Sequence, residues 1–452
     1  LDVDGAKLIY EWAQKGLPVF IMEGAAERTT FNDGKDEELA SIMEQMRALP
    51  NVKDVEIYDA SEDFDYFDKV AEGYDDGLYD AMQEMGIRPY AEFNGANHQL
   101  LTQTREAEDG SRYLYAYNYC SNDYHENSFI DEVKTEDHGT NIKTEIRMDG
   151  MYIPYTIDSW TGEVTEIGNY YYEDGQTVFP IDLDYDDIAL YAFEPVTEES
   201  FHATSTNADM AYGTENGVAV RATQSGTYTT ELSSGRTVTE EINVPESYPI
   251  TNWDVTVESW TPSENVLRSE ETIGDVHTVN TKVDTDKTDI NVKLDELTTW
   301  NNIPEVGESV SGIGYYDAKF NWDSSSADGA YIDFGDEFYA GMKVWINGQK
   351  VGGDVSANPT KAPQSILENY EGKEQYTGGI SWNDPVADIS EYLVDGENTI
   401  HIEYSSPLGN VQLSRGAIKP GGGRNWWGEM RQTKYLPYGP SQAVIVPFVD
   451  SE

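Results

Sequence analysis

The sequence contains a single cysteine, Cys120, among its 452 residues. One thiol cannot close a disulfide within the chain, and it excludes both a cysteine-based zinc cluster and a CxxC redox pair. Because Cys120 ends the strand-like run 113–120, we interpret it as a small buried hydrophobic side chain. The six histidines are scattered without paired spacing, so the sequence predicts no zinc site.

Basic residues are scarce, since 29 Lys and Arg stand against 84 Asp and Glu, for a formal net charge of −55. This balance excludes nucleic-acid binding as the main function, because neutralising phosphates requires a basic surface. It also disfavours docking on anionic lipid. No apolar run approaches about 18 residues, so no membrane span is expected. The acids are dispersed, which is typical of a solvated acidic surface on a protein that works in salt or outside a cell.

Motifs for nucleotide binding and hydrolysis are missing as well. The sequence has neither a G-x-S-x-G elbow nor a G-x-x-x-x-G-K-[ST] phosphate loop. Paired carboxylates of the glycosidase type cannot be singled out, because 84 acids bring many pairs close together by chance. We therefore assign no catalytic residue.

Calcium is the metal that the composition favours, because hard oxygen ligands are abundant. The densest acidic cluster comprises Asp182, Asp184, Asp186 and Asp187, and no complete EF-hand loop accompanies it. A structural calcium site and a solvated strand end both remain open for this cluster.

Residues 1–105 alternate helical and strand patterns. Helices are predicted over 6–14, 36–49 and 78–85, and short apolar strands over 17–22, 52–58 and 87–93. Such alternation favours a parallel sheet covered by helices. Three strands are few for a doubly wound domain, so we predict a partial α/β domain of flavodoxin-like type and expect its first half upstream of Leu1.

The pattern changes to period two after residue 105. Residues 106–198 contain six short strand patterns, over 113–119, 141–148, 151–157, 163–172, 176–183 and 188–193. Asp149-Gly150 and Asp174-Gly175 separate some of these runs and predict hairpin turns. We predict a small antiparallel β-sandwich over 106–198.

The remainder divides into a polar stretch and a second strand-rich region. Residues 199–245 are rich in Thr, Ser, Glu and Gly, and a linker and an edge hairpin both remain open for them. Residues 246–452 contain eight of the ten tryptophans and recurring turn signals such as Asn347-Gly348 and Asp395-Gly396. Many short strands with regular turns favour a jelly-roll-like sandwich. The sequence thus predicts a multidomain, mainly β protein.

Aromatic residues supply the candidate ligand site. Sugars present apolar C–H faces that stack on Trp and Tyr, while neighbouring polar side chains bind the hydroxyls. Two segments combine these residue types, and their candidate carbohydrate-binding residues are Trp382 and Asn383 in one, and Arg424, Asn425, Trp426 and Trp427 in the other. Trp322 and Trp345 lie in strand alternation and are predicted to pack in the core.

Several motifs occur in a characteristic order. In the C-terminal third they cover 311–316, 330–335, 342–352, 388–393 and 396–403, and upstream they cover 16–20, 86–89, 113–118 and 155–163. The C-terminal order resembles the galactose-binding-like jelly roll of glycoside hydrolases, as in family 2 sugar-binding domains, and the upstream motifs resemble the stretch that follows the catalytic barrel in such enzymes. Within that group, the chain is most similar to the C-terminal part of family 106 α-L-rhamnosidase-like proteins.

The resemblance implies the C-terminal, non-catalytic portion of a secreted, extracellular bacterial glycoside hydrolase. Its catalytic carboxylates would belong to a (β/α)₈ barrel, and the sequence shows no eight-fold strand–helix series. The implied partners are a carbohydrate and an upstream catalytic domain of the same polypeptide. A stand-alone carbohydrate-binding or structural cell-surface module without an enzymatic parent is the alternative.

Overall fold

The computed structural model describes residues 1–22, 25–30, 33–55, 77–93, 100–118, 142–158, 164–183, 187–273, 276–335, 340–352, 380, 385–416 and 435–452. The chain forms two compact units, one of residues 1–152 with 172–183 and one of residues 153–171 with 184–452. Strands dominate and form several antiparallel sheets, which confirms the predicted mainly β class. Among the described helices, none combines the length and apolar character that crossing a bilayer requires.

The first unit opens with a small α/β layer. Its elements are α1 (Val3–Gln14), β1 (Val19–Met22), α2 (Asp36–Arg47), β2 (Val52–Val55) and α4 (Leu78–Glu84). The Asp2 carboxylate accepts a hydrogen bond from the Gly5 amide and so caps the start of α1. The two strands run parallel, and the apolar stripes of α1 and α2 bury Ile21 and Val52. The predicted helix–strand alternation is confirmed for this part.

The prediction that residues 87–93 add a third strand to the parallel sheet is wrong. Ala91–Phe93 forms β3, which pairs antiparallel with β6 (Ile142–Asp149) and joins the sheet β3-β6-β10-β9, where β9 is Tyr171–Glu173 and β10 is Gln176–Leu183. Ala91 lies opposite Met148, which is fully buried, so this pairing covers Ala91 with an apolar neighbour. A short apolar run does not show from sequence which sheet it joins.

Five of the six strands expected between residues 106 and 198 are present, with ends shifted by a few residues. The single strand predicted over 163–172 is wrong, because this run forms β8 (Val164–Glu166) and β9 in two different sheets. The five that are present include β5 (Arg112–Asn118), which pairs with β4 (Leu100–Glu106), and β7 (Tyr152–Ile157) and β11 (Ile188–Pro195). Asp174 and Gly175 have φ values of 49° and 80° and connect the paired strands β9 and β10, so this hairpin is confirmed. The hairpin predicted at Asp149-Gly150 is wrong, because β6 pairs with β10 while β7 pairs with β8.

Five strands lie in the stretch for which the sequence left a linker and an edge hairpin open. They are β12 (Ala203–Thr206), β13 (Met210–Thr214), β14 (Gly217–Ala222), β15 (Gly226–Leu232) and β16 (Thr237–Ile242). Strands β12, β15 and β16 form one sheet, while the β13–β14 hairpin joins β26 (Val444–Ser451) at the end of the chain.

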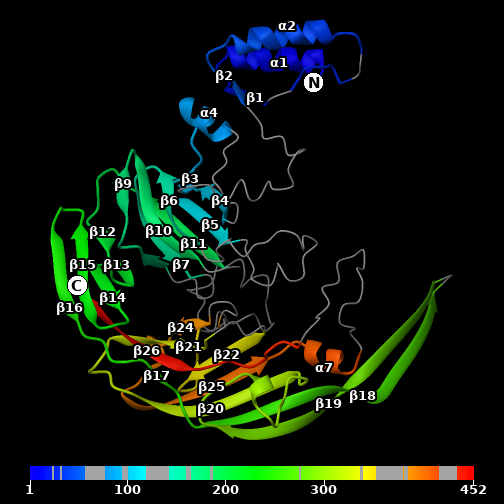
Figure 1. Ribbon diagram of the computed structural model, residues 1–452, viewed down its shortest axis with the longest axis vertical. Coiled ribbons are helices and arrows are strands. Elements are labelled where there is room, and N and C mark those ends of the chain that lie inside the picture. The colour runs from blue at the N-terminus through cyan, green and yellow to red at the C-terminus, as the bar shows by residue number, and fades with distance from the viewer. Residues whose placement is uncertain are drawn as a thin grey trace. The chain divides into compact units, whose positions relative to one another are not determined.

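Two sheets of the second unit enclose its main core. The first has the order β19-β18-β20-β25-β22-β23, in which these strands span Val276–Leu294, Trp253–Ile273, Gly312–Trp322, Gly396–Ser405, Gly341–Ile346 and Gln349–Lys350. The second contains β13, β14, β26, β21 (Gly329–Asp333) and β24 (Val386–Asp388), with β17 (Tyr248–Pro249) beside β26. Apolar side chains of both sheets meet in one cluster that includes Val255, Ile402 and Ile445. The result is an antiparallel β-sandwich (Figure 1).

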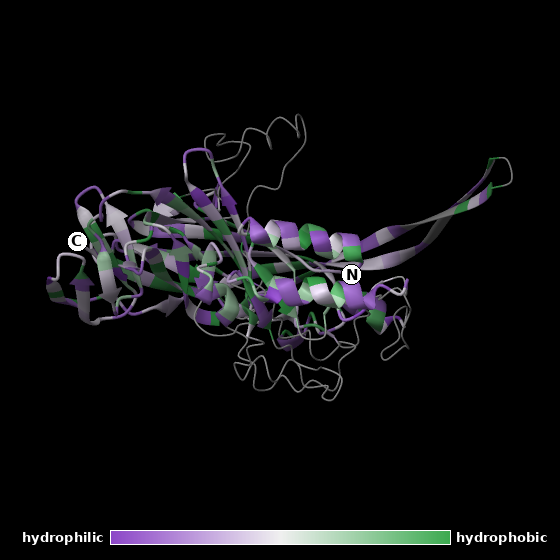
Figure 2. Ribbon diagram, turned by 90° about the horizontal axis from the view of Figure 1, so that it is seen from above, coloured by the Kyte–Doolittle hydropathy of each residue, from purple (hydrophilic) through white to green (hydrophobic). Residues whose placement is uncertain are grey.

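Strands β18 and β19 extend beyond this sandwich. They pair with each other along their whole length, from Trp253 opposite Leu294 to Ile273 opposite Val276. In contrast, β20 pairs only with residues Asp254–Ser259 of β18. The remaining length is a curved two-stranded ribbon with the apolar residues Ile273 and Val276 exposed at its tip (Figure 2). The sequence analysis did not predict this ribbon.

Candidate functional site

The predicted carbohydrate-binding residues Trp382, Asn383, Arg424, Asn425, Trp426 and Trp427 lie outside the described residues, as does Cys120. Their assignment stays a prediction. The described part of the chain has its own candidate, which the sequence analysis did not find.

The acidic cluster considered for calcium is only partly described, because Asp184 and Asp186 lie outside the described residues. Asp182 forms an ion pair with Lys143 at 2.9 Å, and the Asp187 carboxylate accepts a hydrogen bond from the Ile188 amide. Within the described ranges, no three or more His, Cys, Asp or Glu side chains converge as metal ligands. A calcium site therefore stays a prediction.

The candidate site lies on the sheet β19-β18-β20-β25-β22-β23, on its outer face, which is the face turned away from the core of the sandwich. Side chains on a strand alternate between the two faces, and residues paired across strands share a face. Tyr316, Ile402 and Val344 point into the core. The residues next to them in each strand lie on the outer face. There the strand register forms one row of five side chains across the sheet: Asp254 on β18, Asp317 on β20, His401 on β25, Trp345 on β22 and Lys350 on β23.

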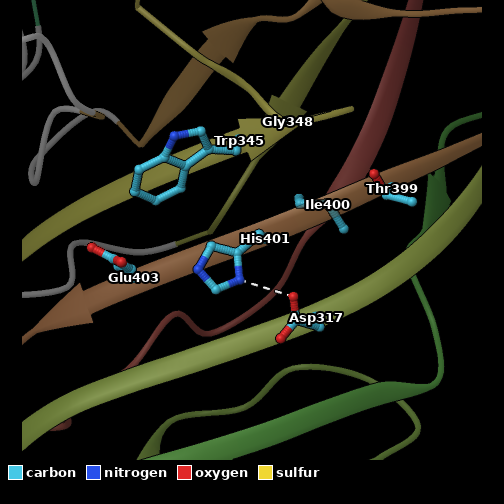
Figure 3. A pocket seen from close by; sticks show the side chains of 7 residues that line it. All are labelled: Asp317, Trp345, Gly348, Thr399, Ile400, His401 and Glu403. Atoms are coloured by element: carbon cyan, nitrogen blue, oxygen red, sulfur yellow. Dashed lines mark hydrogen bonds and ion pairs between the residues drawn. The ribbon is translucent and has the colours of Figure 1, made fainter.

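A hollow of about 390 Å³ opens on this face around Trp345 and His401. Its other lining residues are Asp317, Gly348, Thr399, Ile400 and Glu403 (Figure 3). The Nδ1 atom of His401 lies 2.8 Å from Oδ1 of Asp317, and the ring centroids of His401 and Trp345 are 5.4 Å apart. The imidazole is thus fixed between a carboxylate on one neighbouring strand and an indole on the other.

A tight turn shapes one wall of the hollow. Asn347 and Gly348, predicted as a turn, have positive φ values of 51° and 77°, as in a type I′ turn, and they connect β22 to β23. The Asn347 side chain donates to the Asn398 side chain and accepts from the Thr399 amide, so the turn is tied to β25. The backbone that presents Trp345 is therefore held in place before any ligand arrives.

The hollow is rich in hydrogen-bond acceptors. Asp317 is exposed and Glu403 is half-buried, with Lys343 directly across from Glu403 on β22. Tyr315 lies next to this group, and burial, followed by the charges of Glu258 and Glu403, raises the pKa of its phenol. Half-exposed rings beside carboxylates and an imidazole suit a ligand that has apolar faces and hydroxyl groups.

Trp322 and Trp345, both predicted to pack in the core, lie in different environments. Trp322 is buried, at 7% exposure, as predicted, whereas Trp345 is half-buried on the outer face, so its core assignment is wrong. The signal was present in the sequence, because Trp345 shares its parity in the strand with Lys343 and not with Val344.

Comparisons with known proteins returned only structural likenesses. No family model matches the chain, and no curated protein matches it. A solved rhamnosidase from Novosphingobium sp. PP1Y has a TM-score of 0.49 at 13% identity, covering 97% of this chain and 32% of its own. An α-L-rhamnosidase from Aspergillus terreus has a TM-score of 0.18 at 13% identity, covering 69% and 27%. One from Dictyoglumus thermophilum has a TM-score of 0.15 at 11% identity, covering 59% and 23%.

This chain therefore spans about a third, or less, of each of these proteins. These three solved structures are rhamnosidases, two of them named as α-L-rhamnosidases.

Proposed function

We propose that this chain is the C-terminal, non-catalytic portion of a secreted bacterial glycoside hydrolase of α-L-rhamnosidase-like type, and that it binds carbohydrate. The observation that supports binding most strongly is the hollow on the outer sheet face, where Trp345 and His401 lie beside two carboxylates. A sugar ring that stacks on Trp345 brings its hydroxyls within reach of His401, Asp317 and Glu403. The enzymatic context comes from the order of the sequence motifs.

The remaining parts of the proposal follow from the same context. The galactose-binding-like domain would comprise residues 246–452, and the partial α/β domain would pack on an upstream catalytic barrel. The large excess of acidic residues and the single cysteine are compatible with an extracellular protein that depends on no disulfide.

The test is a paired assay of the purified chain on aryl-glycosides and on an array of neutral glycans. The proposal predicts glycan binding without turnover. Trp345→Ala should weaken binding by about tenfold or more, because it removes the stacking surface of the hollow. Its effect on the free energy of unfolding should stay below about 1 kcal/mol, since the ring is half-exposed.

Trp12→Ala is the matched control, because Trp12 is an exposed tryptophan on α1, 46% accessible, that does not line the hollow. It should leave glycan binding unchanged. Turnover of an aryl-glycoside would contradict the non-catalytic assignment, and absence of binding to every glycan would contradict the carbohydrate-binding assignment.

A further inference from the structure

A second tryptophan lies on the same outer face, at Trp260 of β18. Along this strand Trp253, Val255 and Val257 are buried, so Asp254 and Trp260 share the opposite parity and lie on the outer side. The indole Nε1 of Trp260 donates to Oε1 of Glu258 at 2.6 Å. The ring is therefore fixed in position before a ligand arrives.

Lys287 completes this small cluster. Its Nζ lies 2.9 Å from the same Glu258 oxygen and 4.4 Å from the centroid of the Trp260 ring. The two donors lower the pKa of the Glu258 carboxyl, which keeps it ionised. A lysine over one face of the indole leaves the rest of the ring for contact with a ligand.

A second hollow, of about 180 Å³, lies beside Trp260 where the base of the β18–β19 ribbon meets α7 (Gly409–Ser414). Pro262, Leu408 and Val411 supply apolar walls, and Asp284 and Gln412 supply polar groups. It thus repeats the chemistry of the first hollow, with an indole beside apolar surface and hydrogen-bonding side chains.

Tyr315 on β20 lies between the two hollows. Its ring is nearly parallel to that of His401, at 21° with centroids 6.5 Å apart. In the strand register Tyr315 lies opposite Glu403 of the first hollow on one side and opposite Thr256, two residues before Glu258, on the other. Trp345, His401, Tyr315 and Trp260 therefore form an aromatic track across four strands, β22, β25, β20 and β18.

The strand register gives the length of this track. Trp345 aligns with Asp254 three strands away, and Trp260 is six residues further along β18. With strands about 4.8 Å apart and about 3.3 Å per residue, the two tryptophans are separated by about 25 Å. A single sugar would occupy one hollow, whereas a chain of several sugars can reach both.

We propose that this aromatic track binds one continuous, neutral oligosaccharide chain, with a first subsite at Trp345 and a second at Trp260. This inference rests on the proposed function and specifies its ligand. Asp317, Glu403, Glu258 and Asp284 line the track, so a chain of uronic acids is repelled. Lys287 offsets the charge of only one of these carboxylates, Glu258.

The experiment is isothermal titration of the full chain with rhamnan, xylan and glucan oligosaccharides of one to six residues. For a backbone that binds, affinity should rise steeply with chain length. Trp260→Ala should weaken hexasaccharide binding by about tenfold and leave binding of the shortest ligand unchanged, whereas Trp345→Ala should weaken both. Trp260→Phe keeps an aromatic ring and should retain most of the hexasaccharide affinity.

The other outcomes separate this inference from the proposed function. If glycans bind through Trp345 but Trp260→Ala has no effect on the hexasaccharide, the second subsite is wrong and the proposed function stands. If no oligosaccharide binds the wild-type chain, both are wrong. Preferential binding of oligogalacturonate or of hexalysine would overturn the neutral-glycan assignment. Near-ultraviolet circular dichroism of each variant checks that the sandwich is intact.

Discussion

The two faces of the six-stranded sheet use aromatic residues in opposite ways. On the inner face Tyr316 is fully buried and its hydroxyl accepts a hydrogen bond from Nε1 of Trp300 at 2.6 Å. Trp300 in turn packs edge-to-face against Tyr404, with ring centroids 5.4 Å apart. On the outer face the adjacent residue, Tyr315, is only half-buried and lies beside His401.

The contrast between the two faces separates aromatic residues that stabilise the fold from those that are available to a ligand. The inner rings find their partners inside the protein, and their polar atoms are satisfied there. The outer rings are positioned by the protein but keep part of their surface accessible. Position in the strand, and not residue type, decides between the two roles.

We expect the largest loss of stability from a substitution among the buried aromatic residues of the inner face. Tyr316→Ala removes a fully buried ring and the acceptor of the Trp300 indole, so the free energy of unfolding of the second unit should fall by about 3–5 kcal/mol. Tyr315→Ala, one residue away, should cost less than about 1 kcal/mol. Chemical denaturation monitored by tryptophan fluorescence measures both, and equal losses would contradict the distinction between the faces.

A polar cluster on the other sheet resembles the inner aromatic residues, because its polar groups are paired inside the protein. Arg221 on β14 makes two hydrogen bonds to Asp450 on β26, at 2.8 and 2.9 Å, and lies 3.5 Å from the centroid of the Phe448 ring. Its side chain is only 16% exposed. Asp450→Ala leaves the guanidinium without its main partner and should lower the free energy of unfolding by about 2–3 kcal/mol.

The matched control for this cluster is Asp254→Ala, which removes an exposed carboxylate that pairs with Lys293 on the outer face. Its effect should stay below about 0.5 kcal/mol in the same denaturation experiment. An equally small effect of Asp450→Ala would show that the Arg221 cluster does not hold β26 in place.

The smallest expected effect concerns a carboxylate of intermediate burial, Glu166 on β8. Burial, followed by the charge of Glu194, raises the pKa of its carboxyl, and the carboxyl group packs against Gly213. A raised pKa means that the folded protein holds this proton more tightly than the unfolded chain. Stability therefore falls as pH rises from the unfolded value near 4.5 through the folded value, and stays low above it.

Glu166→Gln removes this ionisation and should stabilise the protein at neutral pH by less than about 1 kcal/mol, raising Tm by about 1–3 °C. At pH values below the unfolded pKa the difference from wild type should disappear. Thermal unfolding at several pH values measures this difference in Tm. Glu231→Gln, at an exposed position, is the control and should leave Tm unchanged at every pH. A gain that is equal at all pH values would contradict the electrostatic explanation.

Local patterns in the sequence predicted the elements well, and long-range pairing accounts for most of what they missed. Period-two alternation identified β5, β7 and β10, and the Asp174-Gly175 and Asn347-Gly348 turns follow from residues that tolerate positive φ. The partners of Ala91–Phe93 could not be predicted, because a short apolar run fits a parallel and an antiparallel sheet equally well.

The candidate site illustrates the same limit. His401 and Asp317 are 84 residues apart, and only the pairing of β20 with β25 brings them together. The alternation around Trp345 already placed it on the face opposite Val344, but it does not show which face the second sheet covers. The sequence analysis therefore singled out neither His401 and Asp317 nor their assembly, and it placed Trp345 in the core.

Hydroxyl-radical footprinting of the chain, read by mass spectrometry with and without a neutral hexasaccharide that it binds, shows directly which side chains the carbohydrate covers. We expect protection of Trp345, His401, Tyr315 and Trp260, and no change at the exposed Trp12. Protection confined to other residues, with these four unchanged, would show that the outer face of the sheet is not where carbohydrate binds.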